Sequence, residues 1–260
     1  LRSATAYGEK LAILVPGSAH AQHMYGHSLP QRGQWVLALR QFKKADKIHL
    51  KWAKANQVEP QQDWHYSHNL DLMAATYMGM GDFKKALDTW ERAFNFDSRA
   101  VLHSLSLFLL TKSRSEAEQK FKEVEGWGEA WASYVQFLRE ELELSPEKLL
   151  SENLKEVDLS AEWNFSRLID MVKNSFQNHQ ELNAELLKDI QTYFTEKFKA
   201  GGFDGWSNAY LELLRLKRIA EILSMDKLLD ALKPIEFAIQ SGSLCGGKQE
   251  KSLTPCLPLE

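Results

Sequence analysis

Three of the chain's eight histidines fall within one ten-residue stretch, SAHAQHMYGH, which runs from Ser18 to His27. His20, His23 and His27 follow one another at steps of three and four residues. In an α-helix, at 100° per residue, three side chains spaced in this way lie within about 60° of one another on one face. Imidazoles that share a helix face can converge on a single ion, so this stretch favours a metal site if it forms a helix.

A second stretch, DWHYSHNLD at Asp63 to Asp71, combines histidines with carboxylates. His65 and His68 are about one helical turn apart, and Asp71 follows three residues later. Neutral imidazole together with carboxylate suits zinc, iron, nickel or copper. We therefore predict a transition metal ion, with Asp71 as an additional ligand or as a group that orients one. The predicted metal ligands are His20, His23, His27, His65 and His68.

Two other uses of these histidines stay open. They can line a groove or the core with hydrogen bonds to backbone and water, or one of them can shuttle protons without a metal. The HExxH pattern of zinc proteases is absent because no glutamate follows His20. Trp64 and Tyr66 flank His65 and are candidates to wall the groove, although aromatic residues at this spacing more often belong to a core. Arg32 is a candidate to line the groove and bind a ligand carboxylate, although an arginine of this kind more often lies on the solvated surface.

Other motifs for chemistry are absent from the sequence. There is no GxSxG, CxxC or GxGxxG pattern. The segment GSLCGGK at Gly242 to Lys248 spells the beginning of a phosphate loop, but Gln249 stands where that loop needs Ser or Thr for magnesium. No strand is expected before it and no helix after it. We therefore expect no nucleotide cofactor.

Composition and charge limit the class of protein. Of 260 residues, 44% are hydrophobic and 26% are charged, and the net charge is −3 from 32 basic and 35 acidic residues. Without a concentrated basic face, binding to nucleic acid or to a membrane surface is not expected. The only cysteines are Cys245 and Cys256, so no disulfide framework is predicted and a reducing, cytoplasmic location is the expectation.

Apolar residues recur at steps of three and four almost throughout the chain, which is the period of the α-helix. The sequence therefore predicts an all-α protein with more than two-thirds of its residues in helices and no sheet. Asp63, Ser98, Ser113 and Ser160 stand at positions typical of helix N-caps. The predicted helices run near residues 2–14, 19–31, 34–56, 62–80, 83–96, 98–111, 114–125, 128–143, 146–156, 161–178, 180–199, 205–223 and 226–240.

Two segments of the chain superpose on each other, GHSLPQRGQWVLALRQFKKA (Gly26–Ala45) and AATYMGMGDFKKALDTWERA (Ala74–Ala93). The alignment matches glycines, aromatic residues and small residues at the same positions. Two antiparallel helices pack closely only where small side chains oppose large ones. In this pattern the sequence resembles a tetratricopeptide repeat (TPR), with about 14 residues inserted between the copies because their spacing is 48 residues. The matched pairs are Gly33 and Gly81, Trp35 and Phe83, Ala38 and Ala86, Phe42 and Trp90, and Ala45 and Ala93.

The resemblance implies an all-α, TPR-like right-handed helical array (an α-solenoid) whose concave groove receives the histidine side chains. The blocks HAQHMYGHSLPQRGQW and DWHYSHNLDLMAATYMGMGDF resemble bacterial relatives of the tetratricopeptide repeat protein 38 family over residues 15–95. Tyr25, Gly26 and Asp71 depart from that family's pattern. The family implies a helical-repeat protein without an assigned reaction, so the resemblance bears on the fold and on the histidine block.

We expect TPR-like repeats over residues 1–145, additional C-terminal helices packed on the array over 146–241, and a flexible tail over 242–260. The function predicted from the histidines is metal binding in the groove, with a metal-dependent reaction on a small molecule or peptide as one consequence. The alternatives are a scaffold that binds a protein or peptide without metal, and a metal-free acid–base site.

Overall fold

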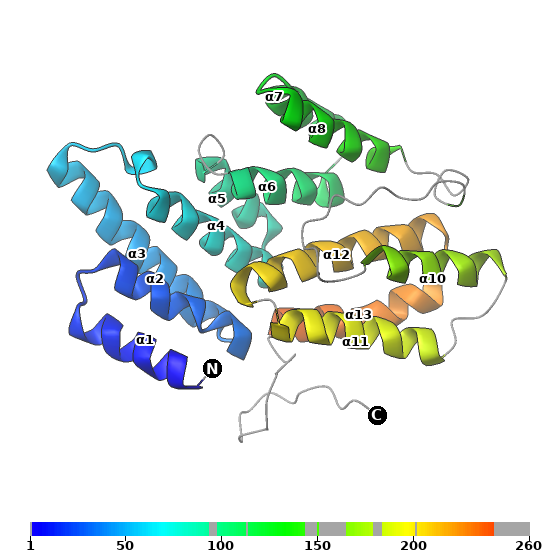
Figure 1. Ribbon diagram of the computed structural model, residues 1–260, viewed down its shortest axis with the longest axis horizontal. Helices are drawn as coiled ribbons and strands as arrows, with labels where there is room; N and C mark the ends of the chain where they lie inside the picture. Colours follow the sequence, from blue (N-terminus) through cyan, green and yellow to red (C-terminus); the bar gives the residue numbers. More distant parts are fainter. Residues whose placement is uncertain are drawn as a thin grey trace. The chain divides into compact units, whose positions relative to one another are not determined.

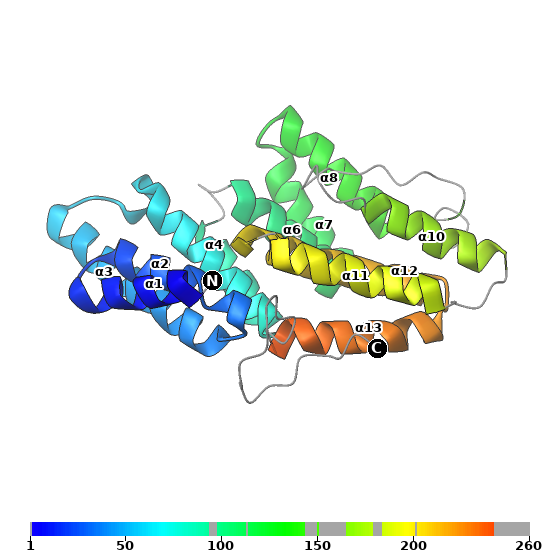
Figure 2. The ribbon, with the colours of Figure 1, turned by 60° about the horizontal axis from the view of Figure 1, so that its bottom comes forward.

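The chain folds into helices throughout the part that the computed structural model describes. These residues are 2–93, 98–112, 114–143, 150, 165–178, 184–200 and 202–241. Helices make up 87% of them and they contain no strand, which confirms the all-α prediction. Figures 1 and 2 show these helices, coloured in chain order. Their bounds are α1 Arg2–Leu14, α2 Ala19–His27, α3 Trp35–Asn56, α4 Trp64–Gly79, α5 Phe83–Ala93, α6 Ser98–Thr111, α7 Arg114–Glu125, α8 Glu129–Leu142, α10 Phe165–Gln177, α11 Ala184–Ala200, α12 Gly202–Ile222 and α13 Asp226–Ser241.

The helix predicted over residues 19–31 is shorter in the structure. It ends at His27, and a turn of 3₁₀-helix follows at Pro30–Arg32. The physical reason is Pro30, which has no N–H to donate back to the preceding turn and therefore cannot continue the α-helical hydrogen-bond ladder. A second such turn, Pro60–Gln62, precedes α4. The caps Ser113 and Ser160, the tail 242–260 and, apart from residue 150, the helix predicted over 146–156 lie outside the described residues.

The described residues divide into two compact units. The first contains those of Leu1–Ser104, Gly201–Ser207 and Ala238–Glu260, and the second contains those of Leu105–Ala200 and Asn208–Phe237. In the first unit, α1 packs on α2, α2 on α3, α3 on α4 and α4 on α5; in the second, α7 packs on α8 and α10 on α11. Neighbours in sequence are thus neighbours in space within each unit.

The two superposed sequence segments form equivalent helix pairs, α2 with α3 and α4 with α5. The turns between the helices contain Gly33 at φ 69° and Gly81 at φ 76°, a left-handed conformation that side chains with a Cβ rarely adopt. Small and aromatic residues at matched positions of α3 and α5 are all buried. These are Ala38 and Ala86, Phe42 and Trp90, and Ala45 and Ala93.

Gly26 permits the close approach of α2 to α3. A Cβ atom built at this position would lie 2.5 Å from Cε1 of Phe42, much less than a van der Waals contact. A larger residue at this position would therefore require Phe42 to move. In the second pair the equivalent residue, Ala74, is fully buried as well. The pairing of small with large side chains therefore sets the distance between the helices in both pairs.

The second unit contains a buried ion pair. Lys197 of α11 is 2% exposed and is paired with Glu212 of α12, while Tyr193 donates a hydrogen bond of 3.0 Å to the same carboxylate. Burial raises the pKa of Glu212, and the charge of Lys197 opposes that rise. The lysine thus balances a charge that would be costly to bury alone.

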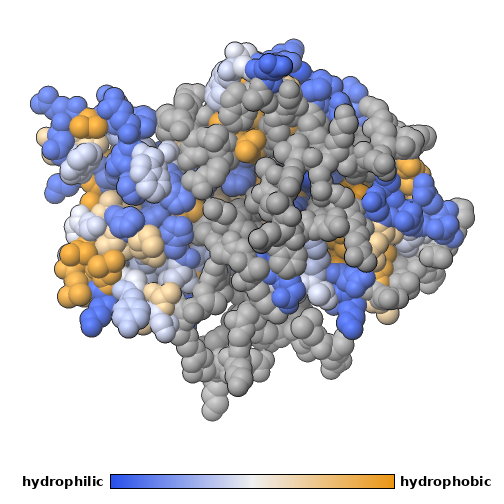
Figure 3. All heavy atoms as spheres, viewed as in Figure 1, coloured by the Kyte–Doolittle hydropathy of each residue, from blue (hydrophilic) through white to orange (hydrophobic). Residues whose placement is uncertain are grey.

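Not every apolar side chain of the first unit is buried. Ile13, Leu14 and Val15, at the C-terminal end of α1, are largely exposed, and Figure 3 shows hydrophobic atoms gathered there. Within the described part of the chain, no helix has the length and hydropathy needed to cross a membrane.

Candidate metal centre

Two capped helices carry the histidines. The hydroxyl of Ser18 accepts a hydrogen bond of 3.2 Å from the backbone N–H of Ala21 and so caps α2. The carboxylate of Asp63 accepts one of 2.9 Å from the N–H of His65, which confirms Asp63 as the N-cap of α4. Such caps satisfy backbone donors that have no partner within the helix, and they fix where each helix starts. The start of each helix sets the direction of the histidines in its first turns.

His23, His27 and His68 form one group, which we name the imidazole triad. Nε2 of His23 and Nε2 of His27 are 2.9 Å apart, and one ring nitrogen from each of the three residues lies within 4.8 Å of the others. The ring centroids are separated by 4.6 Å, 5.0 Å and 5.6 Å. With metal–nitrogen distances of about 2.0–2.1 Å, two imidazoles on one ion place their centroids about 4.5–5.5 Å apart. Two of the three separations lie in this range and the third, between His27 and His68, is slightly longer, so a small shift of the rings would allow all three to bind one ion.

Asn69 determines which nitrogen of His23 faces the triad. Its Nδ2 donates a hydrogen bond of 3.0 Å to the backbone carbonyl of Phe42, which can only accept. The amide oxygen then faces His23, where Nδ1 lies 3.1 Å away and donates to it. Nε2 of His23 is left with its lone pair toward His27. This is the tautomer that a metal ligand needs, fixed through the other ring nitrogen.

The surroundings of His23 keep its ring neutral. Burial is the main cause that lowers the pKa of His23, to about 3, and the neighbouring His27 contributes in the same direction. The hydrogen bond to Asn69 opposes this shift only in part. Phe42 packs against the rings of both His23 and His27. At neutral pH, His23 is therefore already in the unprotonated form that binds metal.

His20 and His65 lie beside the triad and are more exposed than its members. The ring of His20 is stacked 6.2 Å from that of His23 and meets the ring of His65 edge-on at 5.4 Å. Nδ1 of His65 is 3.0 Å from Oδ1 of Asp63, and Trp64 stacks on the same imidazole at 3.9 Å. Of the five predicted ligands, the structure thus brings three together and places the other two next to them.

Asp71 lies one helix pair further along the chain. Its Oδ1 accepts hydrogen bonds from Nε1 of Trp90 at 2.7 Å and from Nδ1 of His103 at 3.2 Å. Asp71 stands at the position in α4 that matches His23 in α2, and Trp90 matches Phe42. The carboxylate of Asp71 therefore forms its hydrogen bonds between α4, α5 and α6. His23 lies at the equivalent place in the preceding helix pair.

The predicted groove-lining residues occupy different environments. Trp64 is exposed and covers His65, whereas Tyr66 is buried, and its hydroxyl accepts a hydrogen bond of 2.9 Å from Arg92. Arg32 is exposed on the short turn before α3. Sequence reasoning gave no role to Asn69, although a polar residue within the apolar run of α4 is a sign of a buried hydrogen bond.

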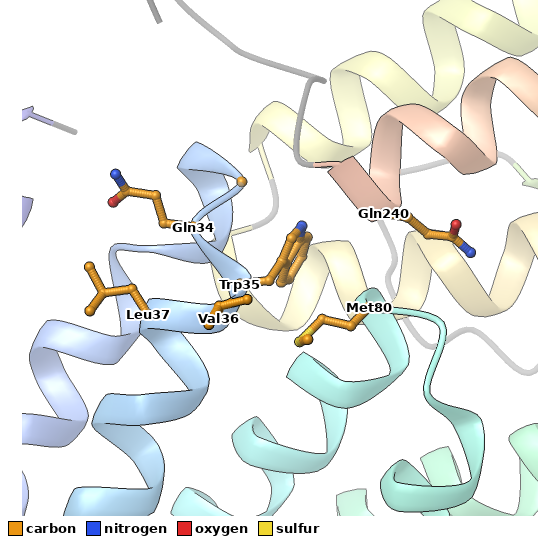
Figure 4. A pocket seen from close by; sticks show the side chains of 7 residues that line it. Gln34, Trp35, Val36, Leu37, Met80 and Gln240 are labelled. Carbon is orange, nitrogen blue, oxygen red and sulfur yellow. The ribbon is translucent and has the colours of Figure 1, made fainter. Parts of the chain in front are cut away.

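The cavities of the first unit include two that bear on the site. One, of about 530 Å³, is lined by side chains that include His20, His49, Asp63 and His65, and we name it the His65 pocket. The other, of about 460 Å³, lies where α3 begins and α4 ends, and Figure 4 shows Trp35 and Met80 among its lining. That second cavity has no titratable side chain in its lining, whereas the His65 pocket adjoins the histidine cluster and is lined by groups capable of acid–base or ligand chemistry.

Comparison with known proteins identifies no relative. The chain matches no family model, no curated protein and no solved structure. The arguments for its function therefore depend on the geometry of the site.

Proposed function

We propose that this protein binds a first-row transition metal ion through the imidazole triad, in the groove of a TPR-like right-handed helical array. The observation that carries the proposal is the 2.9 Å distance between Nε2 of His23 and Nε2 of His27, with a nitrogen of His68 within reach of both. Without an ion, two ring nitrogens at this distance must share one proton. An ion can replace that proton and accept a lone pair from each of the three rings.

Burial and orientation support metal binding over simple packing. A buried imidazole is usually satisfied by hydrogen bonds to backbone or water. His23 instead directs one nitrogen to Asn69 and the other to a second imidazole, and its lowered pKa keeps it in the ligand form. A side-chain amide behind a histidine is the kind of outer-shell support that metal sites use to fix ligand orientation.

Three protein ligands leave coordination positions for water or a substrate, as in catalytic rather than structural zinc sites. Bound there, zinc, iron, nickel or copper would act as a Lewis acid or lower the pKa of bound water, toward a small molecule or peptide. His20 and His65 are proposed as further ligands or as a second shell, because they stand beside the triad. Asp71 is not included, since its carboxylate already accepts from Trp90 and His103.

Metal content tests the proposal. Protein purified without a histidine tag is analysed for zinc, iron, nickel and copper, next to His23→Ala and His103→Gln. We expect close to one ion per chain in the parent and in His103→Gln, a buried histidine outside the triad, and none in His23→Ala. If all three proteins lack metal after exposure to each ion, or if His23→Ala keeps it, the triad is not a metal site. The histidines would then be the lining of a peptide-binding groove.

A further inference from the structure

The His65 pocket contains a carboxylate oxygen that lacks a hydrogen-bond donor. Asp63 uses Oδ1 for both the N–H and the ring of His65. Its Oδ2 is 3.6 Å from Nε2 of His49, which is beyond hydrogen-bond distance, and no donor among the described residues is closer. An ionised oxygen in a pocket wall without a donor is an acceptor available to a ligand.

His49, on the other side of this gap, also has a polar atom that is not used in a hydrogen bond. Its side chain is 9% exposed, and its Nε2 has no hydrogen-bond partner. The ring of His49 is held against Tyr66 and Trp52, so this nitrogen faces Asp63. The 3.6 Å separation is that of an ion pair and is too long for a hydrogen bond, so each of the two groups still has room for a hydrogen bond to a ligand in the pocket.

The charge and the shape of the pocket indicate which class of ligand it suits. No lysine or arginine lines it, and Asp63 is the acidic residue of its lining, so the pocket favours a positively charged group. Trp52, which is 49% exposed, and Ile48 provide apolar walls. A carboxylate next to an exposed indole suits an organic cation, because the indole face attracts positive charge. A volume of about 530 Å³ is that of a small-molecule site.

We propose that the His65 pocket binds small molecules that carry an ammonium group on an apolar body, with the cation on Oδ2 of Asp63 and the body against Trp52 and Ile48. The site adjoins the triad through His20, which lines the pocket and stacks on His23. It goes beyond the proposed metal centre, and ammonium binding requires no metal.

The test is calorimetric titration of the full chain, in the presence of a chelator, with three ligands of one shape. These are 2-phenylethylammonium, the neutral 2-phenylethanol and the anionic phenylacetate. We expect the cation to bind at least about tenfold more tightly than the alcohol, the difference that one charge pair in a partly exposed site supplies, and the anion not to bind. Equal binding of alcohol and cation, or tighter binding of phenylacetate, would overturn the proposal.

Asp63→Asn is the decisive variant. Asparagine caps a helix as well as aspartate does, so α4 keeps its start while the pocket loses its charge. We expect affinity for the cation to fall about tenfold or more, as one charged hydrogen bond is removed. Asp88→Asn, which removes an exposed charge from α5, is the matched control and should bind as the parent does.

A zinc titration of His23→Ala separates an organic cation from a metal. If zinc binds this variant, Asp63→Asn abolishes that binding, and the ammonium does not bind, then the pocket is a second metal site and the proposal is wrong. Because the ammonium ligand is titrated into metal-free protein, its binding does not depend on whether the triad binds a metal.

Discussion

Asn69 connects the fold to the chemistry of the triad, because one side chain holds both a backbone carbonyl of α3 and the ring of His23. Its two hydrogen bonds, 3.0 Å to Phe42 and 3.1 Å to His23, leave the amide only one orientation. That orientation selects the tautomer of His23. If Asn69 were replaced, the ring would be free to turn or to change tautomer, and the metal would bind to a less ordered set of ligands.

For Asn69→Ala we expect metal affinity to fall about 10–100-fold, as for other changes to groups that orient metal ligands. Asn69→Asp, which still accepts from Nδ1 of His23, should retain more of the affinity. The measurements are competitive titration against a chromophoric chelator and the visible spectrum of the cobalt-substituted protein. A merely structural role would lower stability and leave both unchanged, and that result would contradict the positioning role of Asn69.

The lowered pKa of His23 predicts how the stability of the metal-free protein depends on pH. An unfolded histidine binds a proton near pH 6.5, whereas folded His23 does so only near pH 3. Between these values the unfolded state holds one proton more, so the free energy of unfolding falls as the pH falls, by about 1.4 kcal/mol per pH unit from this group.

Urea unfolding of the chelated parent and of His23→Gln at several pH values measures this contribution. Other groups titrate in the same range, so the difference between the two proteins isolates His23. The parent should lose stability more steeply than the variant between pH 6.5 and the acid limit of folding. Parallel curves for the two proteins would show that burial does not lower this pKa.

At the residue scale, the sequence predicted five metal ligands, and the three members of the triad are among them. The steps of three and four residues place His20, His23 and His27 on one helix face, but they do not decide which of them meets α4. That depends on the caps Ser18 and Asp63 and on the packing of α2 against its neighbours. The role of Asn69 depends on a carbonyl 27 residues away, which periodicity does not reveal.

At the scale of the helices, the sequence pattern and the structure agree most closely in the two helix pairs. Left-handed glycines, small residues and large aromatics recur in α2–α3 and in α4–α5, as the alignment of the two segments predicts. The same correspondence explains the place of Asp71. Asp71 occupies the position in its own pair that His23 occupies in the preceding pair, and it therefore faces the next helices instead of the imidazole triad.

Gly26→Leu tests the contact between α2 and α3. A side chain here must displace Phe42, so we expect a loss of about 1–3 kcal/mol in the free energy of unfolding. Gly17→Leu is the matched control, because nothing lies within 4 Å of its Cβ position and stability should change by less than about 0.5 kcal/mol. Urea unfolding compares the two. Equal stability of both variants would contradict the close approach at Gly26.

At the scale of the whole molecule, the sequence predicted a helical protein, and the structure confirms it. The helical period runs through nearly all the described residues, which is why most helix bounds agree with those expected. Helix α2 ends earlier than predicted because Pro30 lacks a backbone N–H to donate to the preceding turn. This local effect outweighs the helical period of the apolar residues. Whether the pairs continue as a right-handed superhelix depends on small rotations between successive pairs, which no residue pattern specifies.

Circular dichroism tests the fold in solution. We expect a helical fraction above about two-thirds, well beyond the usual third, and no strand. The signal should be lost on heating in one or two transitions, since the described residues form two units. A substantial strand content would contradict the all-α fold.

The central claim is that the triad binds a metal ion, and a thermal unfolding experiment in four arms tests it most directly. The parent and His23→Ala, both purified without a tag, are freed of metal and then melted with and without added zinc, iron, nickel or copper. An ion that binds the folded state alone adds about 2.7 kcal/mol at 100 times its dissociation constant. We predict that at least one ion raises the melting temperature of the parent by several degrees and leaves that of His23→Ala unchanged. A parent whose melting temperature responds to none of the ions, or a variant that responds equally, would contradict the account.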